Sequence, residues 1–423
     1  MKWSNLLVVI LSVILMACGK NKEEVGYQAR IEKSAKRGVA FNLNTMEDAV
    51  LLAPYITWDY NWSESMQDDV LPFWLDGNGV EFCPMTWSRN YNASRIRAYV
   101  AAHPSTKYLL GFNEPNLTDQ ANMTPAKAAE YWPTVVALAK ELNLKLVAPA
   151  LNYGTLAGYH DPIKWMDEFL ACPGVSIDDI DVIALHCYMP SSGGIIDFVK
   201  KFSKYNKPIW MTEFCAWDSD AKSPSSVEAQ IDYMCEVLNF FEQSPLVERY
   251  AWFIPRYKTP GTYPYMQMLT NSSPLDPSPI ELTDLGQIYC KYSVFDPKAF
   301  VRFPLNASDF TRCQDDIHIR VSNDAQAAGL MVYDMAETQW TEYQVYVETP
   351  IPSLSIRTCS YSGASVALYV DDVLVTVQTI PGLKDMSAWQ ATTFDVNLTT
   401  GRHTIKLQCM DGDLNLSQIS EKQ

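Results

Sequence analysis

Short apolar runs recur through the first two thirds of the chain, and helix-like segments separate them. The runs predict strands at 37–42, 55–62, 81–87, 108–114, 145–153, 181–189, 208–217 and 249–255. Most are rich in β-branched or aromatic residues, as strands buried on both faces usually are. Pro84 and Pro149 count against central strands, because proline cannot donate to a ladder, but both lie toward strand ends.

The segments between the strands carry helix signals. Thr124-Pro125 places a hydroxyl N-cap before a proline at the first helical position, and an amphipathic pattern follows. Ser225 and Glu228 form a capping-box pattern at the start of another helix. Strand and helix alternating eight times predict an α/β fold, a (β/α)8 TIM barrel, over residues 35–292.

The C-terminal part of the chain has a different pattern. Because roughly 250 residues suffice for a barrel, a chain of 423 residues has room for a second domain. Short alternating stretches such as 343–347, 365–370 and 403–407 predict an antiparallel β-sandwich over residues 301–423. Residues 257–279, rich in Pro, Ser, Thr and Tyr, predict a long loop beside the face that carries the strand ends.

Glu114 and Glu213 each end an apolar, strand-like run, the fourth and the seventh in order. A carboxylate is costly to bury there, and the carboxyl ends of barrel strands meet at one face. A single glutamate at a strand end is often a cap or an ion-pair partner, but the pair is more specific. Glycosidic bond cleavage needs one carboxylic acid and one carboxylate, so we predict that the two glutamates are catalytic, with Asn113 placed to hold a sugar hydroxyl.

Other polar and aromatic residues are predicted to shape the cleft. His186 and Tyr188 share one face of their strand, so either could donate a hydrogen bond to Glu213 and keep it ionised. Asn61 and Asn116 are further candidates for binding sugar hydroxyls. The tryptophans at strand ends either stack on pyranose rings or pack the top of the barrel; they are Trp58, Trp62, Trp87, Trp217 and Trp252.

Charge and composition exclude some classes of partner. A net charge of -16 argues against a protein that binds nucleic acid. The sequence lacks the clusters of Lys and Arg that binding to a phosphate backbone requires. The ten cysteines show no paired spacing, so no disulfide framework can be read. The five histidines are not at metal-ligand spacing, and we expect no catalytic metal and no cofactor. The oligomeric state is open, with a monomer favoured.

The N-terminus predicts a targeting signal. An apolar run from Leu6 to Met16, too short to span a membrane, ends in Leu15-Met16-Ala17-Cys18. This ending resembles a bacterial lipobox, with residues 1–17 as the signal peptide, Cys18 as the lipidated residue and 18–34 as a polar tether. An ordinary secretory peptide cleaved near Ala17 is the alternative. The lipobox implies a cell-envelope protein held to the membrane by a lipid anchor, and an acidic stretch after Cys18 points to the outer-membrane surface.

The first domain resembles the family 128 glycoside hydrolases. The segments that carry the resemblance are Arg37 to Asn42, Trp58 to Trp62, Phe82 to Trp87, Gly111 to Asn116, Trp210 to Phe214 and Tyr250 to Phe253. The resemblance implies a (β/α)8 barrel that acts on β-1,3-glucan with retention, with Glu114 as the acid/base and Glu213 as the nucleophile.

The second domain resembles, more weakly, the family 6 carbohydrate-binding modules. The matching stretches include 329–333, 340–343, 368–372, 388–390 and 414–416. The resemblance implies that Tyr333 and Trp389 sandwich a sugar and that Asn415 fixes it. A sandwich that only braces the barrel is the alternative.

We therefore expect a lipid-anchored, retaining endo-β-1,3-glucanase with an accessory sandwich, acting on a polysaccharide or oligosaccharide. One alternative is a surface glycan-binding lipoprotein that hydrolyses little. Another is a glycosidase of the same clan that acts on a different β-glucan or on mannan.

Overall fold

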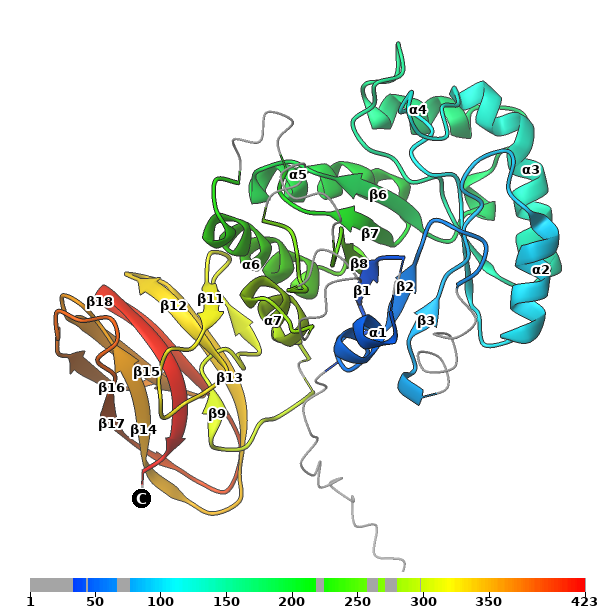
Figure 1. Ribbon diagram of the computed structural model, residues 1–423. Coiled ribbons are helices and arrows are strands. Elements are labelled where there is room, and N and C mark those ends of the chain that lie inside the picture. Colours follow the sequence, from blue (N-terminus) through cyan, green and yellow to red (C-terminus); the bar gives the residue numbers. More distant parts are fainter. Residues whose placement is uncertain are drawn as a thin grey trace, which may run out of the picture.

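The computed structural model describes residues 33–42, 45–66, 77–217, 224–256, 265–270, 280–296 and 298–422. The predicted signal peptide, Cys18 and nearly all of the tether lie outside these residues, as does most of the predicted loop 257–279. The chain forms two parts, an α/β domain and a C-terminal domain made of strands (Figure 1). Within the described residues, no helix is long and apolar enough to cross a membrane.

The α/β domain is built on parallel strands at all eight predicted positions. They are β1 (Arg37–Ala40), β2 (Trp58–Tyr60), β3 (Glu81–Phe82), β4 (Tyr108–Leu110), β5 (Lys145–Val147), β6 (Ile183–Cys187), β7 (Ile209–Phe214) and β8 (Val247–Trp252). Six pair in the order β3-β2-β1-β8-β7-β6, and β4 pairs with β5. Single parallel bridges, Met85 with Leu110 and Val147 with Val182, lie next to both edges of the β4-β5 pair.

Helices lie outside this parallel core. They are α1 (Met46–Leu52), α2 (Ala93–Ala102), α3 (Pro125–Glu141), α4 (Pro162–Leu170), α5 (Ser192–Phe202), α6 (Val227–Gln243) and α7 (Asp284–Lys291), with short turns η2 (Ile177–Asp179) and η3 (Ser203–Tyr205). Thr124 caps α3 as predicted, accepting from the Lys127 amide. The predicted cap Ser225 is wrong by one residue, because Ser226 accepts from the Ala229 amide and Glu228 is then the second residue of α6.

The C-terminal domain is antiparallel. Its strands are β9 (Leu305–Asn306), β10 (Arg312–Cys313), β11 (His318–Val321), β12 (Leu330–Ala336), β13 (Trp340–Val347), β14 (Ile351–Cys359), β15 (Ala364–Val370), β16 (Val373–Ile380), β17 (Gln390–Leu398) and β18 (Gly401–Glu421). The first half of β18 pairs with β13 and β15, and its second half pairs with β12 and β14. Gly412 lies between the halves with φ +74°, and a Cβ there would lie 2.3 Å from the Gly363 carbonyl oxygen.

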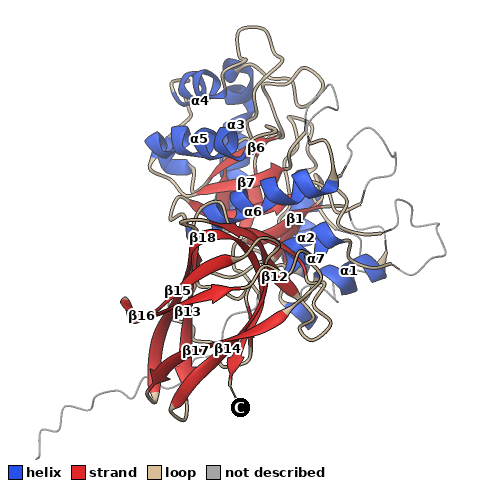
Figure 2. Cartoon of the chain, turned by 90° about the vertical axis from the view of Figure 1, so that its left-hand side faces the viewer, coloured by secondary structure: helices blue, strands red, loops and turns tan. Residues whose placement is uncertain are grey.

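The two domains share a hydrophobic core. One cluster of buried apolar side chains includes Phe241 and Tyr292 of the α/β domain together with Phe310 and Ile319 of the C-terminal domain. Strand β11 packs against α6 and α7 and lies beside these helices in Figure 1. Figure 2 shows the strands of the C-terminal domain next to the helices of the α/β domain. The Ile319 amide donates to Cys235 Sγ at 3.4 Å on α6. The C-terminal domain is therefore packed against the α/β domain and not merely tethered to it.

Candidate active site

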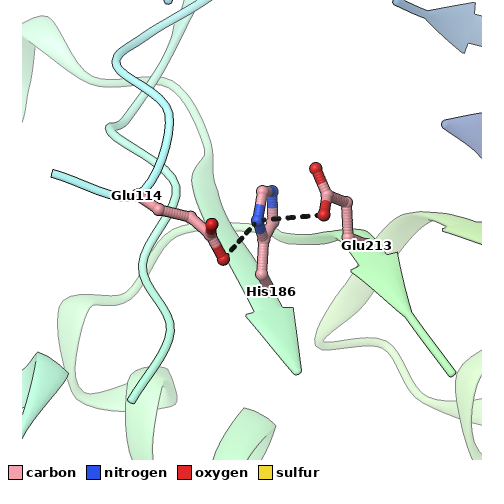
Figure 3. Close-up of side chains that lie close together, drawn as sticks. All are labelled: Glu114, His186 and Glu213. Carbon is pink, nitrogen blue, oxygen red and sulfur yellow. Dashed lines mark ion pairs between the residues drawn. The ribbon is translucent and has the colours of Figure 1, made fainter. Parts of the chain in front are cut away.

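Glu114 and Glu213 lie together in the α/β domain, with His186 between them (Figure 3). Glu213 is on β7, His186 is on β6, and Glu114 is in the segment after β4. Nδ1 of His186 lies 3.1 Å from Glu114 Oε1 and 3.4 Å from Glu213 Oε2. One carboxylate oxygen of each glutamate lies within 4.8 Å of the other. Segments a hundred residues apart thus place two carboxyl groups around one small volume.

Three side chains donate hydrogen bonds to Glu213. Tyr60 OH and Trp62 Nε1 both donate to Oε1 at 2.7 Å, and Tyr188 OH donates to Oε2. Burial raises the pKa of Tyr60 and of Tyr188 well above 10, so both phenols remain protonated and keep donating. Since an indole N–H can only donate, this set of partners matches an ionised carboxylate.

Glu114 has fewer donors and an unusual backbone. Asn152 Nδ2 donates to its Oε1 at 3.2 Å, and the Tyr153 amide donates to Asn152 Oδ1 at 2.8 Å. The second bond turns the amide group of Asn152 so that its nitrogen faces Glu114. Glu114 has φ +43°, in the left-handed region that non-glycine residues adopt only where the surroundings enforce it. The surrounding segments therefore fix the direction of this side chain.

Burial controls the proton affinities of the group. Glu114 is 6 % exposed, Glu213 is 4 % exposed and His186 is fully buried. Burial raises the pKa of Glu213, while His186 and the donors from Tyr188 and Trp62 oppose that rise. For His186, burial disfavours the charged form, but Glu213 and Glu114 outweigh it and the pKa lies above 6.5. His186 therefore holds its proton more strongly than a free imidazole does, and its charge favours the ionised form of Glu213.

The two glutamates face a cavity of about 550 Å³. Of the predicted substrate-binding residues, Trp62, Trp87, Trp217, Tyr188 and Asn113 line it. Their contact with a sugar stays a prediction, but their positions permit it. Aromatic faces next to carboxylates and amides are the usual lining of a site that binds a ring with hydroxyl groups.

Comparison with known proteins fits this geometry. Residues 38–289 of the chain match the protein family described as the glycosyl hydrolase catalytic core. A family 128 subgroup II endo-beta-1,3-glucanase from Pseudomonas viridiflava is 36 % identical, with TM-score 0.54, over 61 % of this chain and 98 % of that chain. The chain belongs to the family 128 glycoside hydrolases.

Two further proteins are similar to this glycoside hydrolase. A subgroup II endo-beta-1,3-glucanase from Sorangium cellulosum is 31 % identical, with TM-score 0.52, over 60 % of this chain and 97 % of that chain. Alkali-sensitive linkage protein 1 from Schizosaccharomyces pombe is 26 % identical over 242 residues, which are 55 % of this chain and 40 % of that protein. The chain thus spans about two fifths of the length of that curated relative.

Several predicted positions in the glycoside hydrolase differ from the structure. Trp252 does not line the cavity, because its ring is buried and its Nε1 donates to the Met266 carbonyl. Asn61 closes the turn after β2, where it bonds the backbone of Ser63 and Ser65. His186 contacts the two glutamates, but it is fully buried and does not line the cavity.

Two more candidate residues do not line the cavity. Trp58 packs in the interior against Trp210, with ring centroids 5.0 Å apart. Asn116 Nδ2 donates to the Asn152 carbonyl at 2.6 Å, so it supports the segment that carries Asn152.

The sequence prediction missed Tyr60, Asn152 and Gln120. Tyr60 precedes Trp62 by two residues, and the alternation rule that paired His186 with Tyr188 would have found it. Gln120 Oε1 accepts from Asn113 Nδ2 at 3.1 Å and also lines the cavity. No sequence signal distinguishes Asn152 or Gln120 from other loop amides.

The predicted ligand residues of the C-terminal domain are only partly accessible. Asn415 is buried, and its Oδ1 accepts from the Asp334 amide at 2.8 Å, so it holds backbone and does not face a ligand. Trp389 Nε1 donates to Asn323 Oδ1 at 2.8 Å. The ring of Tyr333 lies under the guanidinium of Arg320, 4.7 Å from the ring centroid.

Glu114, His186 and Glu213 also have donor atoms close enough to surround a metal ion. The tyrosine and tryptophan donors on Glu213 already use lone pairs that an ion would need. We expect that treating the glycoside hydrolase with EDTA leaves its rate of hydrolysis unchanged. A loss of activity that a divalent cation restores would contradict the prediction that no metal takes part.

Replacing Tyr60 should change the pH dependence of hydrolysis. Tyr60→Phe removes a donor to the ionised form of Glu213, so protonation of Glu213 becomes easier and the acid limb of kcat/KM moves to higher pH. Losing a hydrogen bond to a charged group should also lower the optimal rate by roughly tenfold. Tyr233→Phe is the control, because the Tyr233 hydroxyl is buried without a hydrogen bond to a described residue. An unchanged acid limb in Tyr60→Phe would show that Tyr60 is only a packing residue.

Proposed function

We propose that the protein is a retaining endo-β-1,3-glucanase, with Glu213 as the nucleophile and Glu114 as the acid/base. The observation that carries the proposal is the pair of buried glutamates, with oxygens within 4.8 Å, at a cavity walled by tryptophans. The endo-beta-1,3-glucanases of the same family, 36 % and 31 % identical, support the choice of β-1,3-glucan as substrate. The eight parallel strands and the bridges between their two sheets further support a (β/α)8 barrel.

The spacing of the carboxyl groups supports retention. Retaining glycosidases hold their two carboxyl groups about 5 to 5.5 Å apart, whereas inverting enzymes leave about 6.5 to 9.5 Å for a water molecule. One oxygen of Glu114 lies within 4.8 Å of one oxygen of Glu213, which is on the short side of these ranges and fits the spacing of retaining enzymes. A direct attack by one carboxylate on the anomeric carbon is therefore the geometry that fits.

The hydrogen bonds support the assignment of roles. Glu213 accepts from Tyr60, Trp62 and Tyr188, a set of donors suited to a carboxylate that must stay ionised. Glu114 accepts from Asn152, and Nδ1 of His186 lies 3.1 Å from the same oxygen. In the first step Glu114 protonates the leaving oxygen while Glu213 forms the bond to the sugar. In the second step Glu114 removes a proton from water, which then releases the sugar from Glu213.

Product analysis tests the proposal directly. The purified protein is incubated with laminarin, curdlan, lichenan and mannan, and the products are resolved by chromatography. We expect oligosaccharides of several lengths from laminarin and curdlan at early times. Release of glucose alone would contradict endo cleavage. Preferred cleavage of lichenan or mannan would contradict the substrate, and binding without products would favour a glycan-binding lipoprotein.

We also propose that the mature protein is attached to a membrane of the cell envelope through lipidated Cys18. The support is the lipobox-like ending Leu15-Met16-Ala17-Cys18. Cys18→Ala should move the protein from the membrane fraction to the soluble fraction. The several acyl chains of a lipoprotein bind a membrane stably, and this variant cannot carry them at position 18. The measurement is the distribution of the protein between the two fractions, with Cys172→Ala as the control. An unchanged distribution of Cys18→Ala would contradict lipidation at this position.

A further inference from the structure

Gln230 is a fully buried amide on α6, the helix that follows β7 along the chain. Two of its neighbours on this helix, Ile231 and Met234, are apolar and also buried. An amide group is costly to bury unless its donor and its acceptor are both hydrogen-bonded. The buried position of Gln230 therefore requires a partner for each end of the amide.

Both ends of this amide bond the backbone of a single residue, Ala216. The Ala216 amide donates to Gln230 Oε1 at 3.1 Å, and Gln230 Nε2 donates to the Ala216 carbonyl at 3.0 Å. Strand β7 ends at Phe214, so Ala216 lies beyond the ladder. Buried backbone groups there need partners from another source. A glutamine side chain provides them, because its amide carries a donor and an acceptor side by side.

The residue after Ala216 is Trp217, which lines the cavity at the two glutamates. The Trp217 amide donates to the Tyr188 carbonyl at 3.1 Å. The rings of Trp217 and Tyr188 meet edge to face, with centroids 6.3 Å apart. Tyr188 OH in turn donates to Glu213. Trp217 thus extends an aromatic wall whose other member contacts a catalytic glutamate.

The direction of Glu213 is set by other elements than α6. Its hydrogen bonds come from Tyr60 on β2, from Trp62 just after β2 and from Tyr188 just after β6. Losing the contacts of Gln230 should therefore displace Trp217 more than Glu213. Substrate binding and the chemical step should respond differently as a result.

We propose that Gln230 is a positioning residue for the substrate: it holds the backbone of Ala216 and thereby fixes the ring of Trp217 against a sugar in the cavity. The inference rests on the proposed function, because it takes that ring as a contact for a glucan chain. It adds a side chain of the helix layer that acts on binding without touching the substrate. A stacked ring binds the ground state and the transition state alike, so its displacement raises KM and leaves kcat nearly unchanged.

Gln230→Leu tests the inference, with kcat and KM measured on laminarihexaose. The substitution removes both hydrogen bonds to Ala216 and keeps a side chain of similar size. We expect KM to rise by about tenfold, as for the loss of an aromatic contact. Asn239→Leu is the matched control, because Asn239 is also a fully buried amide on α6. Its Nδ2 donates to the Gln314 carbonyl at 2.8 Å, and it does not line the cavity, so its loss should leave KM unchanged.

A double-mutant cycle separates positioning from a general loss of stability. Trp217→Ala should raise KM at least as much as Gln230→Leu does, and the combination should add nothing, because both changes act through one ring. Effects on KM that multiply would overturn the inference. An unchanged KM in Gln230→Leu, or an equal rise in Asn239→Leu, would also overturn it. Melting curves show which variants are folded, and Gln230→Glu, which keeps the acceptor for the Ala216 amide, replaces Gln230→Leu if that variant does not fold.

A measurement without substrate keeps the inference distinct from the proposed function. Hydrogen exchange of residues 214–217, followed by mass spectrometry, should be faster in Gln230→Leu and unchanged in Asn239→Leu. Unchanged exchange in Gln230→Leu would overturn the inference whatever the substrate is. Hydrolysis of mannohexaose and of no β-1,3-glucan would refute the proposed substrate, and the same cycle on mannohexaose would then decide the role of Gln230. If laminarihexaose binds without hydrolysis, its affinity by calorimetry replaces KM in the cycle.

Discussion

Glu213→Ala is expected to abolish hydrolysis of laminarin, and added azide should then restore turnover with formation of an α-glycosyl azide. Removing the carboxylate opens space on the face from which it attacks, and azide enters that space as a small anionic nucleophile. The bound leaving group can still be protonated, because Glu114 is intact. The configuration of the azide product, read by proton NMR, is the measurement.

Glu114→Ala should fail in a different way. Loss of general acid catalysis costs about 10²- to 10⁴-fold, but aryl glycosides with acidic phenols need no proton and should be largely spared in the first step. Azide then attacks the intermediate on Glu213 and gives the β-glycosyl azide. The same azide anomer from both variants would contradict the assignment of Glu213 as the nucleophile and Glu114 as the acid/base. First products of inverted configuration from the unmodified protein would refute retention itself.

Removing the C-terminal domain should have the second large effect. Deleting residues 301–423 uncovers the faces of α6 and α7 on which β11 packs. Burying a side chain such as Ile319 contributes about 1.5–3 kcal/mol, and several such residues lie in the shared core. We therefore expect low folded yield and equal losses of activity on insoluble curdlan and on soluble laminarihexaose.

A milder variant keeps this prediction testable if the truncated chain does not fold. Ile319→Ala should lower the melting temperature of the whole molecule in one transition, because large-to-small changes in a core cost about 2–5 kcal/mol. Val375→Ala is the control, since Val375 is exposed on β16. A truncated protein that is stable and loses activity only on curdlan would instead indicate an independent binding module.

The sequence was sufficient for the strands of the α/β domain. A strand buried on both faces is apolar without alternation, and runs of that kind predicted all eight positions. The predicted ends were too long at most strands. At β4 the apolar residues continue to Phe112, but the ladder stops at Leu110 and Glu114 has a left-handed backbone. Burial continues past the strand because the segments that carry the site are buried too.

The pairing of Glu114 with Glu213 was also predicted from the sequence, because two glutamates that each follow an apolar run are more specific than one and are costly to bury. The partners of this pair were less accessible. Tyr60 and Glu213 are 153 residues apart, and their contact depends on how β2 and β7 face each other. For Trp252, the sequence shows an aromatic residue near a strand end but not that its indole bonds Met266 inside the core.

What the sequence determined by itself is local: which segments are strands, which two glutamates lie near the ends of such segments, and where the antiparallel domain begins. These follow from periodicity and from the cost of burying a charge. The tertiary structure decided which side chains surround Glu213, that β18 is one strand shared by both parts of its sheet, and that Asn415 supports the backbone of Asp334. It also decided the packing of β11 on α6 and α7, which joins the two domains. Contacts of this kind depend on distances between segments far apart in the chain, and the residue pattern within one segment carries no information about them.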